Sequence, residues 1–449
     1  MKFTYLTFTG LALSLTSVSA FSKVTPEEAN KLGTELTLFG AEKQGNASGT
    51  IPAYEGGLNE DEGRNPLDNR FPEDKPLFVI TKDNMSRYKN HLTSGQIALF
   101  EKYPDTYRMP VYQTRRTAAY SDKHYDKVKN NATSAELVDG GNGVSNFDEL
   151  VPFPIPKSGL EVIWNHVSRY RGGSVERNVA RLPVQRSGAF TPIKIRAQYT
   201  APQYLEDGYD EQVDKNILFY YRSAIKAPAR LTGNVLLVHE TIDQIEQPRL
   251  AWSYNAGQRR VRRAPQTAYD APSQASDGLA TVDQTDMFNG APDKYDWKLI
   301  GKKEIYIPYN SYKLADQKLK YEDIIQQGHI NQDLARYELH RVWKIEATLK
   351  EDERHLYGKR TYYIDEDSWQ ISLADHYDNR GVLWRMSEGH PIQFVDINAL
   401  WYVTIANYDL LSGRYLAELS NEEDKPFNFE KSVNRQSFTA AAIRRAGKR

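Results

Sequence analysis

The chain has 449 residues, 40% of them hydrophobic and 26% charged, as is typical of a globular protein with one large or several smaller domains. A formal net charge of −1 argues against a nucleic-acid partner, which would need a dominant basic surface. The absence of cysteine excludes disulfides, cysteine-ligated zinc, iron–sulfur clusters and thiol nucleophiles. Aromatic residues reach 12%, which favours broad, half-buried β-sheets.

Residues 1–20 have the composition of a secretory signal peptide. Lys2 supplies the positive end, residues 5–15 form a short apolar region, and Val-Ser-Ala at 18–20 is a cleavage site. An uncleaved anchor is the alternative, because the apolar region is short. No cysteine follows for a lipoprotein anchor, and no later apolar run is long enough to span a bilayer. We expect an exported, periplasmic protein.

The segment 21–155 is expected to wrap around a larger body. Thr25 begins a capping box (Thr-Pro-Glu-Glu) that predicts a helix ending near Gly40. Residues 45–76 are rich in Gly, Pro, Asn and acidic residues, which is typical of an extended segment. Prolines at 152, 154 and 156 mark a boundary, after which residues 156–420 form the main domain and 421–449 a C-terminal tail.

The main domain alternates apolar and polar residues with period two, which predicts antiparallel strands. They are expected at 193–200, 217–225, 235–241, 250–254, 259–263, 297–307, 337–349, 394–396 and 400–408. Strands as long as 337–349 twist and curl, so the sheet should form either a closed barrel or an open half-barrel. The strand-poor stretch 267–292 has the length of a functional lid or binding loop.

Residues 360–386 predict a three-stranded meander. Its second strand should place Trp369, Ile371, Leu373 and Tyr377 on one apolar face. The Asp-Glu-Asp-Ser sequence at 365–368 is interpreted as a solvated turn. Such a meander must bury its apolar face against another layer.

Signatures of catalysis are missing: the sequence has no G-x-S-x-G, H-E-x-x-H, P-loop or dinucleotide fingerprint. We interpret His239, His340, His355 and His376 as solvated or hydrogen-bonded surface residues. Accordingly we assign no catalytic residue, no metal ligand and no cofactor.

Two features could bind a ligand. Alternation in the Arg-rich stretch 259–263 places Arg260 and Arg262 on one face, where they could hold a phosphate or carboxylate headgroup. Ion pairing with neighbouring strands is the alternative. Strand aromatics could line an apolar cavity, or could form an ordinary core. The candidate ligand-binding residues are Trp252, Tyr254, Arg260, Arg262, Arg341, Trp343, Ile345, Trp369, Ile371, Leu373 and Trp384.

The motifs GTIPAYEGGL, WSYNAGQRRVRRAPQTAYDAP and RYELHRVWKIEATLKEDERHLYGKRTYYIDEDSWQI resemble the exported proteobacterial family catalogued as domain of unknown function 1329. The resemblance implies a mainly β fold with helices, similar to the lipoprotein carriers LolA and LolB. Their curved antiparallel half-barrel has a helical plug and a cavity for acyl chains. It also implies that the protein works together with outer-membrane proteins or with transporters of the resistance-nodulation-division class.

These observations favour a periplasmic carrier for a lipid or other hydrophobic ligand, working without covalent chemistry. The first alternative is an envelope scaffold whose groove is filled by its own N-terminal segment. The second is an enzyme that modifies a lipid or sterol, which the missing motifs disfavour.

Overall fold

The computed structural model describes residues 23–59, 63–264, 269–423 and 425–447. The predicted signal peptide, residues 1–20, lies outside the described residues, as do residues 267 and 268 of the predicted lid. Within the described ranges, every helix is too short or too polar to cross a bilayer.

One sheet of sixteen strands dominates the molecule, and its strand pairs are antiparallel except for a short parallel pairing of β2 with β12. Its strands run in the order β1-β2-β12-β13-β14-β15-β16-β17-β5-β6-β7-β8-β9-β10, with β11 paired to β12 and β18 paired to β5. Their bounds are β1 (Phe78–Ile80), β2 (Met109–Val111), β5 (Ser174–Val184), β6 (Ile193–Thr200), β7 (Ile217–Ala227), β8 (Val235–Thr241), β9 (Leu250–Asn255), β10 (Arg260–Ala264), β11 (Tyr295–Pro308), β12 (Tyr337–Leu349), β13 (Lys359–Asp365), β14 (Ile371–Tyr377), β15 (Leu383–Phe394), β16 (Ala399–Asp409), β17 (Tyr415–Leu419) and β18 (Phe427–Asn428).

Helices are short and lie around or inside this sheet. The α-helices are α1 (Pro26–Ala29), α2 (Ser94–Lys102), α3 (Tyr125–Ser134), α4 (Gly159–Ser168), α5 (Glu211–Asp214), α6 (Tyr321–Ile324) and α7 (Ala440–Ala446). A separate two-stranded sheet pairs β3 (Glu136–Val138) with β4 (Gly143–Ser145). The predominance of strands confirms the predicted mainly β fold with helices.

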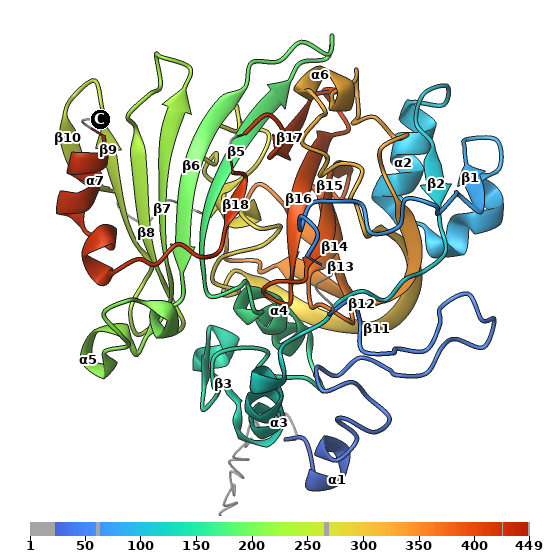
Figure 1. Ribbon diagram of the computed structural model, residues 1–449, viewed down its shortest axis with the longest axis horizontal. Helices are drawn as coiled ribbons and strands as arrows, with labels where there is room; N and C mark the ends of the chain where they lie inside the picture. The colour runs from blue at the N-terminus through green and yellow to red at the C-terminus, as the bar shows by residue number, and fades with distance from the viewer. Residues whose placement is uncertain (1–22, 60–62, 265–268, 424, 448–449) are drawn as a thin grey trace, which may run out of the picture.

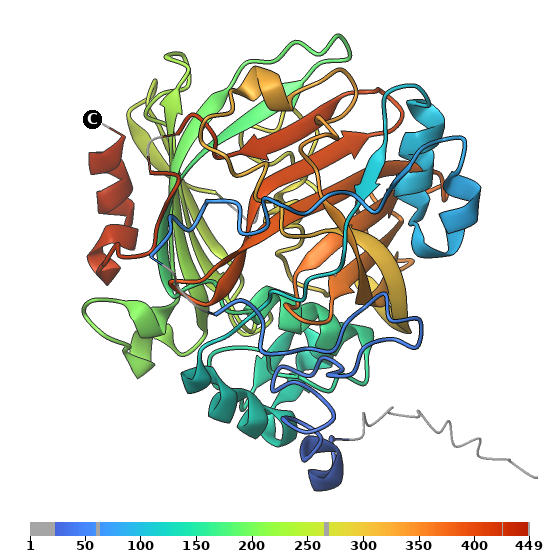
Figure 2. The ribbon, with the colours of Figure 1, turned by 45° about the vertical axis from the view of Figure 1, so that its right-hand side comes forward.

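The sheet curves without closing. Strands β5–β10 and strands β11–β16 bend toward each other around α4, as Figures 1 and 2 show. The path of paired strands ends at β1 and at β10, which do not pair with each other within the described residues. The open half-barrel is therefore confirmed, and the alternative of a closed barrel is wrong.

We call the side of the sheet that holds α4 the inner face. There, apolar residues of β12–β14 pack against α4, against Phe39 of the N-terminal segment and against Phe288. On the outer face, α2 and residues 309–325 cover the middle of the sheet, while α7 covers β8 and β9. The half of the sheet made by β12–β16 is thus covered on both faces.

The N-terminal segment differs from its prediction. The capping box at Thr25 is present, but α1 ends at Ala29 rather than near Gly40. Gly33 has φ +86°, a left-handed conformation that leaves the helical path, and its N–H donates to Leu36 at 2.9 Å. The chain then turns so that the carbonyl of Phe39 accepts a hydrogen bond from Trp369 Nε1 at 2.9 Å. Docking on the sheet replaces helix continuation here.

The meander forms, with two differences. A register shift between Tyr363 and Ile364 pairs Tyr363 with Leu373 and Ile364 with Ile371. Ser372 is therefore an extra residue, and Ile371 and Leu373 point to opposite faces, contrary to the prediction. The turn 365–368 is buried rather than solvated, because the N-terminal segment and β12 lie against it.

Candidate functional site, a cavity between the sheet and an inner loop

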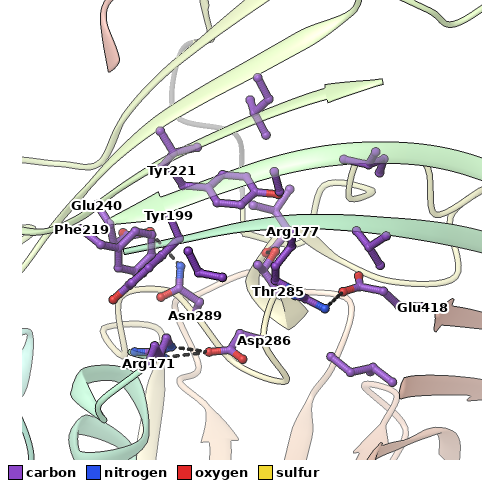
Figure 3. Close-up of a pocket in the computed structure, with 18 of the residues that line it drawn as sticks. Arg171, Arg177, Tyr199, Phe219, Tyr221, Glu240, Thr285, Asp286, Asn289 and Glu418 are labelled. Atoms are coloured by element: carbon purple, nitrogen blue, oxygen red, sulfur yellow. Dashed lines mark hydrogen bonds and ion pairs between the residues drawn. The ribbon is translucent and has the colours of Figure 1, made fainter. Parts of the chain in front are cut away.

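A cavity of about 150 Å³ lies against the inner face of β5–β8 (Figure 3). Its walls are mostly apolar and come from alternate residues of these strands. The apolar and aromatic lining residues on β5–β8 are Val175, Val179, Ile195, Ala197, Tyr199, Phe219, Tyr221, Leu236 and Val238.

The register of the strands gathers these side chains on one face. Val179 lies opposite Ile195, and Tyr199 lies opposite Tyr221, which in turn lies opposite Val238. Directly opposite residues of antiparallel strands point to the same face of a sheet. Across the cavity, Trp401 and Ile405 of β16 complete the apolar wall.

Residues 269–292, which we call the inner loop, close the cavity. Val282, Thr285, Asp286 and Asn289 of this loop line it. Sequence predicts a lid or binding loop here, and the structure places this loop inside the sheet, where Ser276, Thr281, Asp283, Met287 and Phe288 are buried. The loop therefore fills the trough rather than lying across its mouth.

Ion pairs hold the inner loop in place. Asp286 accepts hydrogen bonds from Arg169 at 2.7 Å and from Arg171 at 2.8 and 3.0 Å. Asp283 accepts one from the buried Arg360 at 2.6 Å. Burial alone would raise the pKa of both aspartates, but the adjacent arginines outweigh it and hold both pKa values well below the ordinary range.

Two further carboxylates sit in the cavity wall. Glu418 pairs with Arg181 at 3.0 Å and with Arg177 at 3.4 Å, while Glu240 pairs with Arg249 at 2.7 Å. Burial would raise the pKa of Glu418, but the two arginines lower it. The cavity thus combines an apolar wall with fixed charges.

The predicted ligand-binding residues do not line this cavity. Trp343, Ile345, Trp369 and Ile371 lie on the inner face as expected, but in the half filled by α4 and Phe288. Arg341 is buried and pairs with Glu366 at 3.1 Å. That these residues contact a ligand stays a prediction. In the structure they lie in the filled half of the trough, and none of them lines the cavity.

The remaining candidates are dispersed. Trp252 and Tyr254 are on the outer face beneath α7, and Leu373 is on the outer face in the cluster with α2. Trp384 donates to Asp409 at 3.0 Å. Arg260 and Arg262 are exposed on β10, and pairing through Ser253 to Leu236 puts Arg262 on the face of the cavity. Neighbouring strands lie about 5 Å apart, so these two arginines on β10 are roughly 10 Å, or two strands, from the cavity wall on β8.

Sequence reasoning missed β5, which carries four lining residues. Along this strand, inward positions read Val175, Arg177, Val179 and Arg181. Arginines at inward positions disguise the apolar alternation, although a regular Val–Arg repeat at spacing two was the available signal.

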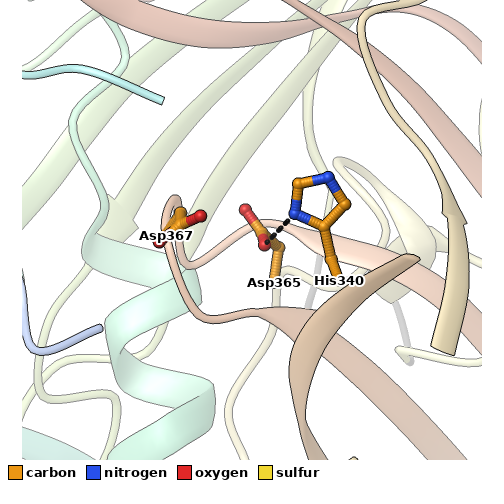
Figure 4. A group of neighbouring side chains, drawn as sticks. All are labelled: His340, Asp365 and Asp367. Atoms are coloured by element: carbon orange, nitrogen blue, oxygen red, sulfur yellow. Dashed lines mark ion pairs between the residues drawn. The ribbon is translucent and has the colours of Figure 1, made fainter. Parts of the chain in front are cut away.

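A buried cluster of His340, Asp365 and Asp367 lies in the other half of the molecule, with its ligand-type atoms within 4.8 Å of one another (Figure 4). Both oxygens of Asp367 accept from Arg116, at 2.6 and 2.9 Å. The cluster therefore offers a metal only His340 Nδ1 and Asp365 Oδ1, which lie 3.8 Å apart, while metals in proteins take four or more ligands. We interpret it as an internal ion network.

The prediction that these histidines and acids are solvated is wrong. His340, His355 and His376 are buried, as are Asp365 and Asp367. Burial and Asp367 raise the pKa of Asp365 to about 6. His355 contacts Arg360 and Asp283, and His376 contacts Ser387 at 3.2 Å. His340, Asp365 and His376 are buried because β12–β16 are covered on both faces, which buries the polar face of each strand as well as the apolar one. His355 and Asp367 lie between strands and are buried against Asp283 and Arg116.

Asp375 has a strongly shifted pKa without lining a cavity. It is buried on β14, where Oδ1 accepts from the backbone N–H of Gly95 at 3.0 Å and from the Thr93 hydroxyl at 3.4 Å. Burial raises its pKa to about 7, and the hydrogen bonds at the start of α2 only partly oppose this. Shifted carboxylates mark functional sites as well as structural ones. Here the contacts indicate a structural role, attaching α2 to β14.

Asp375→Asn should remove a pH-dependent cost. In the folded protein the pKa of Asp375 is raised above its ordinary 3.8. Ionisation of Asp375 therefore lowers the free energy of unfolding of the wild type least below pH 3.8, and progressively more as the pH rises toward 7. At about 1.4 kcal/mol per pKa unit, the variant should gain about 4 kcal/mol relative to wild type between pH 4 and pH 7.5. Urea unfolding measures this difference. If the unfolding free energies of wild type and Asp375→Asn changed in parallel with pH, the prediction would be contradicted. Asp296→Asn is the control, because Asp296 is exposed.

Comparisons with known proteins identify the family of the chain. A family model described as "Protein of unknown function (DUF1329)" matches residues 79–444. Uncharacterized protein PA3922 of Pseudomonas aeruginosa is 54% identical over 444 residues, covering 98% of this chain and 97% of that protein.

Solved structures show a more distant likeness. A Vibrio parahaemolyticus domain described as an outer membrane lipoprotein-sorting protein is 13% identical with a TM-score of 0.44, covering 64% of this chain and 98% of that one. The LolA superfamily protein NE2245 from Nitrosomonas europaea is 13% identical with a TM-score of 0.37, covering 63% and 98%. The family match and the relative in Pseudomonas agree with the resemblance in the motifs, and the chain belongs to the DUF1329 family.

Proposed function

We propose that this protein is a carrier for a lipid or other hydrophobic molecule, which it holds in the inner-face cavity. The observation that carries the proposal is an apolar cavity on the inner face of an unclosed sheet, next to a loop that ion pairs and the buried Phe288 hold in place. Burying apolar surface supplies the binding energy, at about 0.8 kcal/mol per methylene. The proposal requires no covalent step.

The size of the cavity constrains how a ligand enters. About 150 Å³ matches an engineered apolar cavity that holds a benzene-sized molecule. A whole acyl chain is larger, so its binding requires the inner loop to shift and expose more of β5–β8. Motion of a loop that gates a site is a common means of uptake and release.

The cellular setting of the proposal comes from the sequence. Residues 1–20 would direct export to the periplasm, where the carrier would work with an envelope transport system. A transporter of the resistance-nodulation-division class or an outer-membrane protein would receive or supply the ligand. Arg260 and Arg262, at the rim of the sheet, are the contacts that the sequence proposes for a polar headgroup.

A scaffold without a ligand is the second candidate, and one observation favours it. Half of the inner face is already filled by α4, Phe39 and Phe288. To separate the two, the mature protein is purified without detergent, extracted with organic solvent and analysed by mass spectrometry. A stoichiometric lipid supports the carrier. An empty protein that also fails to bind N-phenyl-1-naphthylamine, a neutral apolar fluorophore, supports the scaffold.

Filling the cavity should weaken binding without unfolding the protein. Ala197 lines the cavity on β6, so Ala197→Leu places a larger side chain in the open space. We expect the Kd for N-phenyl-1-naphthylamine to rise at least tenfold, with a change in unfolding free energy of about 1 kcal/mol or less, because space is available. Ala224→Leu, which adds the same atoms on the opposite face of β7, is the control. Equal binding by wild type, Ala197→Leu and Ala224→Leu would show that the ligand binds outside this cavity.

A further inference from the structure

Positive charge exceeds negative charge around the cavity. Four arginines and three carboxylates line it, and a fifth arginine, Arg169, shares Asp286 with Arg171. Asp286 and Glu418 each serve two arginines, and Glu240 serves one. These ion pairs therefore leave two positive charges without a carboxylate of their own. Uncompensated charge in a low-dielectric site is costly, and a bound anion would offset it.

The four arginines that line the cavity differ in how fully their donors are used. Arg171 donates to Asp286 and to three backbone carbonyls. Arg181 donates to Glu418 and to the carbonyl of Gln274 at 2.6 Å, and Arg249 donates to Glu240 and to the carbonyl of Asn289 at 2.9 Å. These guanidinium groups are committed to holding the wall and the inner loop.

Arg177 is the exception. Of its five N–H donors, the described residues engage only one, in a long 3.4 Å bond to Glu418, and its buried Nε has no hydrogen-bond partner among them. The guanidinium is nevertheless fixed, because it lies 5.1 Å from the ring centroids of both Trp401 and Phe427. It is a preorganised cation with donor capacity to spare, and Figure 3 shows it between the apolar wall and Glu418.

We infer that Arg177 binds the anionic group of the ligand, so that the molecule carried is an anionic amphiphile, with an apolar chain against Val179, Ile195 and Leu236. This inference rests on the proposed function and names its ligand class. A carboxylate or a phosphate monoester offers the same chemistry, since both accept paired N–H bonds from a guanidinium. The headgroup therefore sits inside the trough, and not at the rim beside Arg260 and Arg262.

Three ligands with one chain length test the assignment: decanoate, decyl phosphate and 1-decanol, each titrated calorimetrically into the full mature protein at pH 7.5. We expect at least one anion to bind about tenfold or more tightly than the alcohol. The ratio between decanoate and decyl phosphate then identifies the headgroup. If all three bind equally, the inference is overturned while the carrier stands. If none binds, the proposed function itself fails.

Variants locate the headgroup. Arg177→Gln should weaken binding of the preferred anion at least fivefold and leave 1-decanol within twofold, which also shows that the variant is folded. Arg196→Gln is the matched control, because Arg196 pairs with Glu176 at 2.7 Å on the opposite face of the neighbouring strand. Loss of anion selectivity in the Arg260→Gln/Arg262→Gln double variant, with selectivity intact in Arg177→Gln, would overturn the assignment in favour of the rim.

Discussion

Replacing Asp286 by asparagine is expected to lower the free energy of unfolding by about 3–5 kcal/mol at pH 7. Asp286 is the only carboxylate within hydrogen-bonding distance of both Arg169 and Arg171 among the described residues, and both guanidinium groups are buried. Removing its charge leaves them without a counter-ion in a low-dielectric site. Neutral asparagine retains the shape of the side chain, so the effect reports charge rather than packing.

The lowered pKa of Asp286 determines how the stability difference between wild type and Asp286→Asn changes with pH. The pKa of Asp286 is held below its ordinary 3.8, so its contribution is present above that pH and is lost as the pH falls through the folded-state value. The stability difference between wild type and Asp286→Asn should therefore be constant from pH 5 to 8 and shrink below pH 4. Urea unfolding monitored by tryptophan fluorescence measures it.

Asp277→Asn is the matched control, because Asp277 belongs to the same inner loop but pairs with Arg414 at an exposed position. Exposed ion pairs contribute about 1 kcal/mol or less. Equal destabilisation by the two variants would show that the buried arginines are satisfied in some other way, and that the inner loop is not held by charge.

Strands in which apolar and polar residues alternate were predictable from the sequence. Tyr337–Leu349 and Ile193–Thr200 have the bounds that alternation gives them, because each buries one apolar face. The curvature also followed from strand length, whereas the choice of an open half-barrel over a closed barrel came from the resemblance in the motifs. These features depend on local pattern, which a single sequence contains.

The cavity could not be predicted in the same way. Its polar residues occupy inward positions on β5, where Arg177 and Arg181 break the pattern used to find strands. The prediction of a solvated turn at 365–368 was wrong for a related reason. Polar residues there are satisfied by partners distant in sequence, such as Arg116 for Asp367, and no local signal records such pairs. Polarity was therefore mistaken for exposure where ion pairing and long-range docking bury charged side chains.

The aromatic residues show the same limit. Trp343 and Trp369 both lie on the inner face of the trough. The face of Trp343 was predictable from alternation along β12, whereas Trp369 precedes β14 with a left-handed φ of +58°. What covers them was not predictable, because Phe39 comes from a segment more than three hundred residues away in sequence. The N-terminal segment thus joins α4 and Phe288 in filling this half of the trough.

Trp369→Ala is expected to lower the free energy of unfolding by about 3–5 kcal/mol, the range for deleting a fully buried aromatic side chain. Trp369 has no exposed surface and stacks on Trp343 with ring centroids 6.2 Å apart. Its indole N–H is also the donor to the Phe39 carbonyl. The loss should therefore combine a cavity in the core with release of the N-terminal segment.

Two measurements separate these effects. Trp369→Phe keeps most of the packing but removes the N–H donor, so it should cost only about 1–3 kcal/mol, the range for leaving a buried carbonyl unsatisfied. Both variants should expose Lys43 to trypsin faster than wild type does, because the hydrogen bond at Phe39 anchors that part of the segment. Half-buried Trp384→Ala is the control, since it removes the same ring without touching the segment. Cleavage at Lys43 that is unchanged in Trp369→Ala would mean that other contacts dock the N-terminal segment, such as the ion pairs of Arg116 and Arg341 beside it.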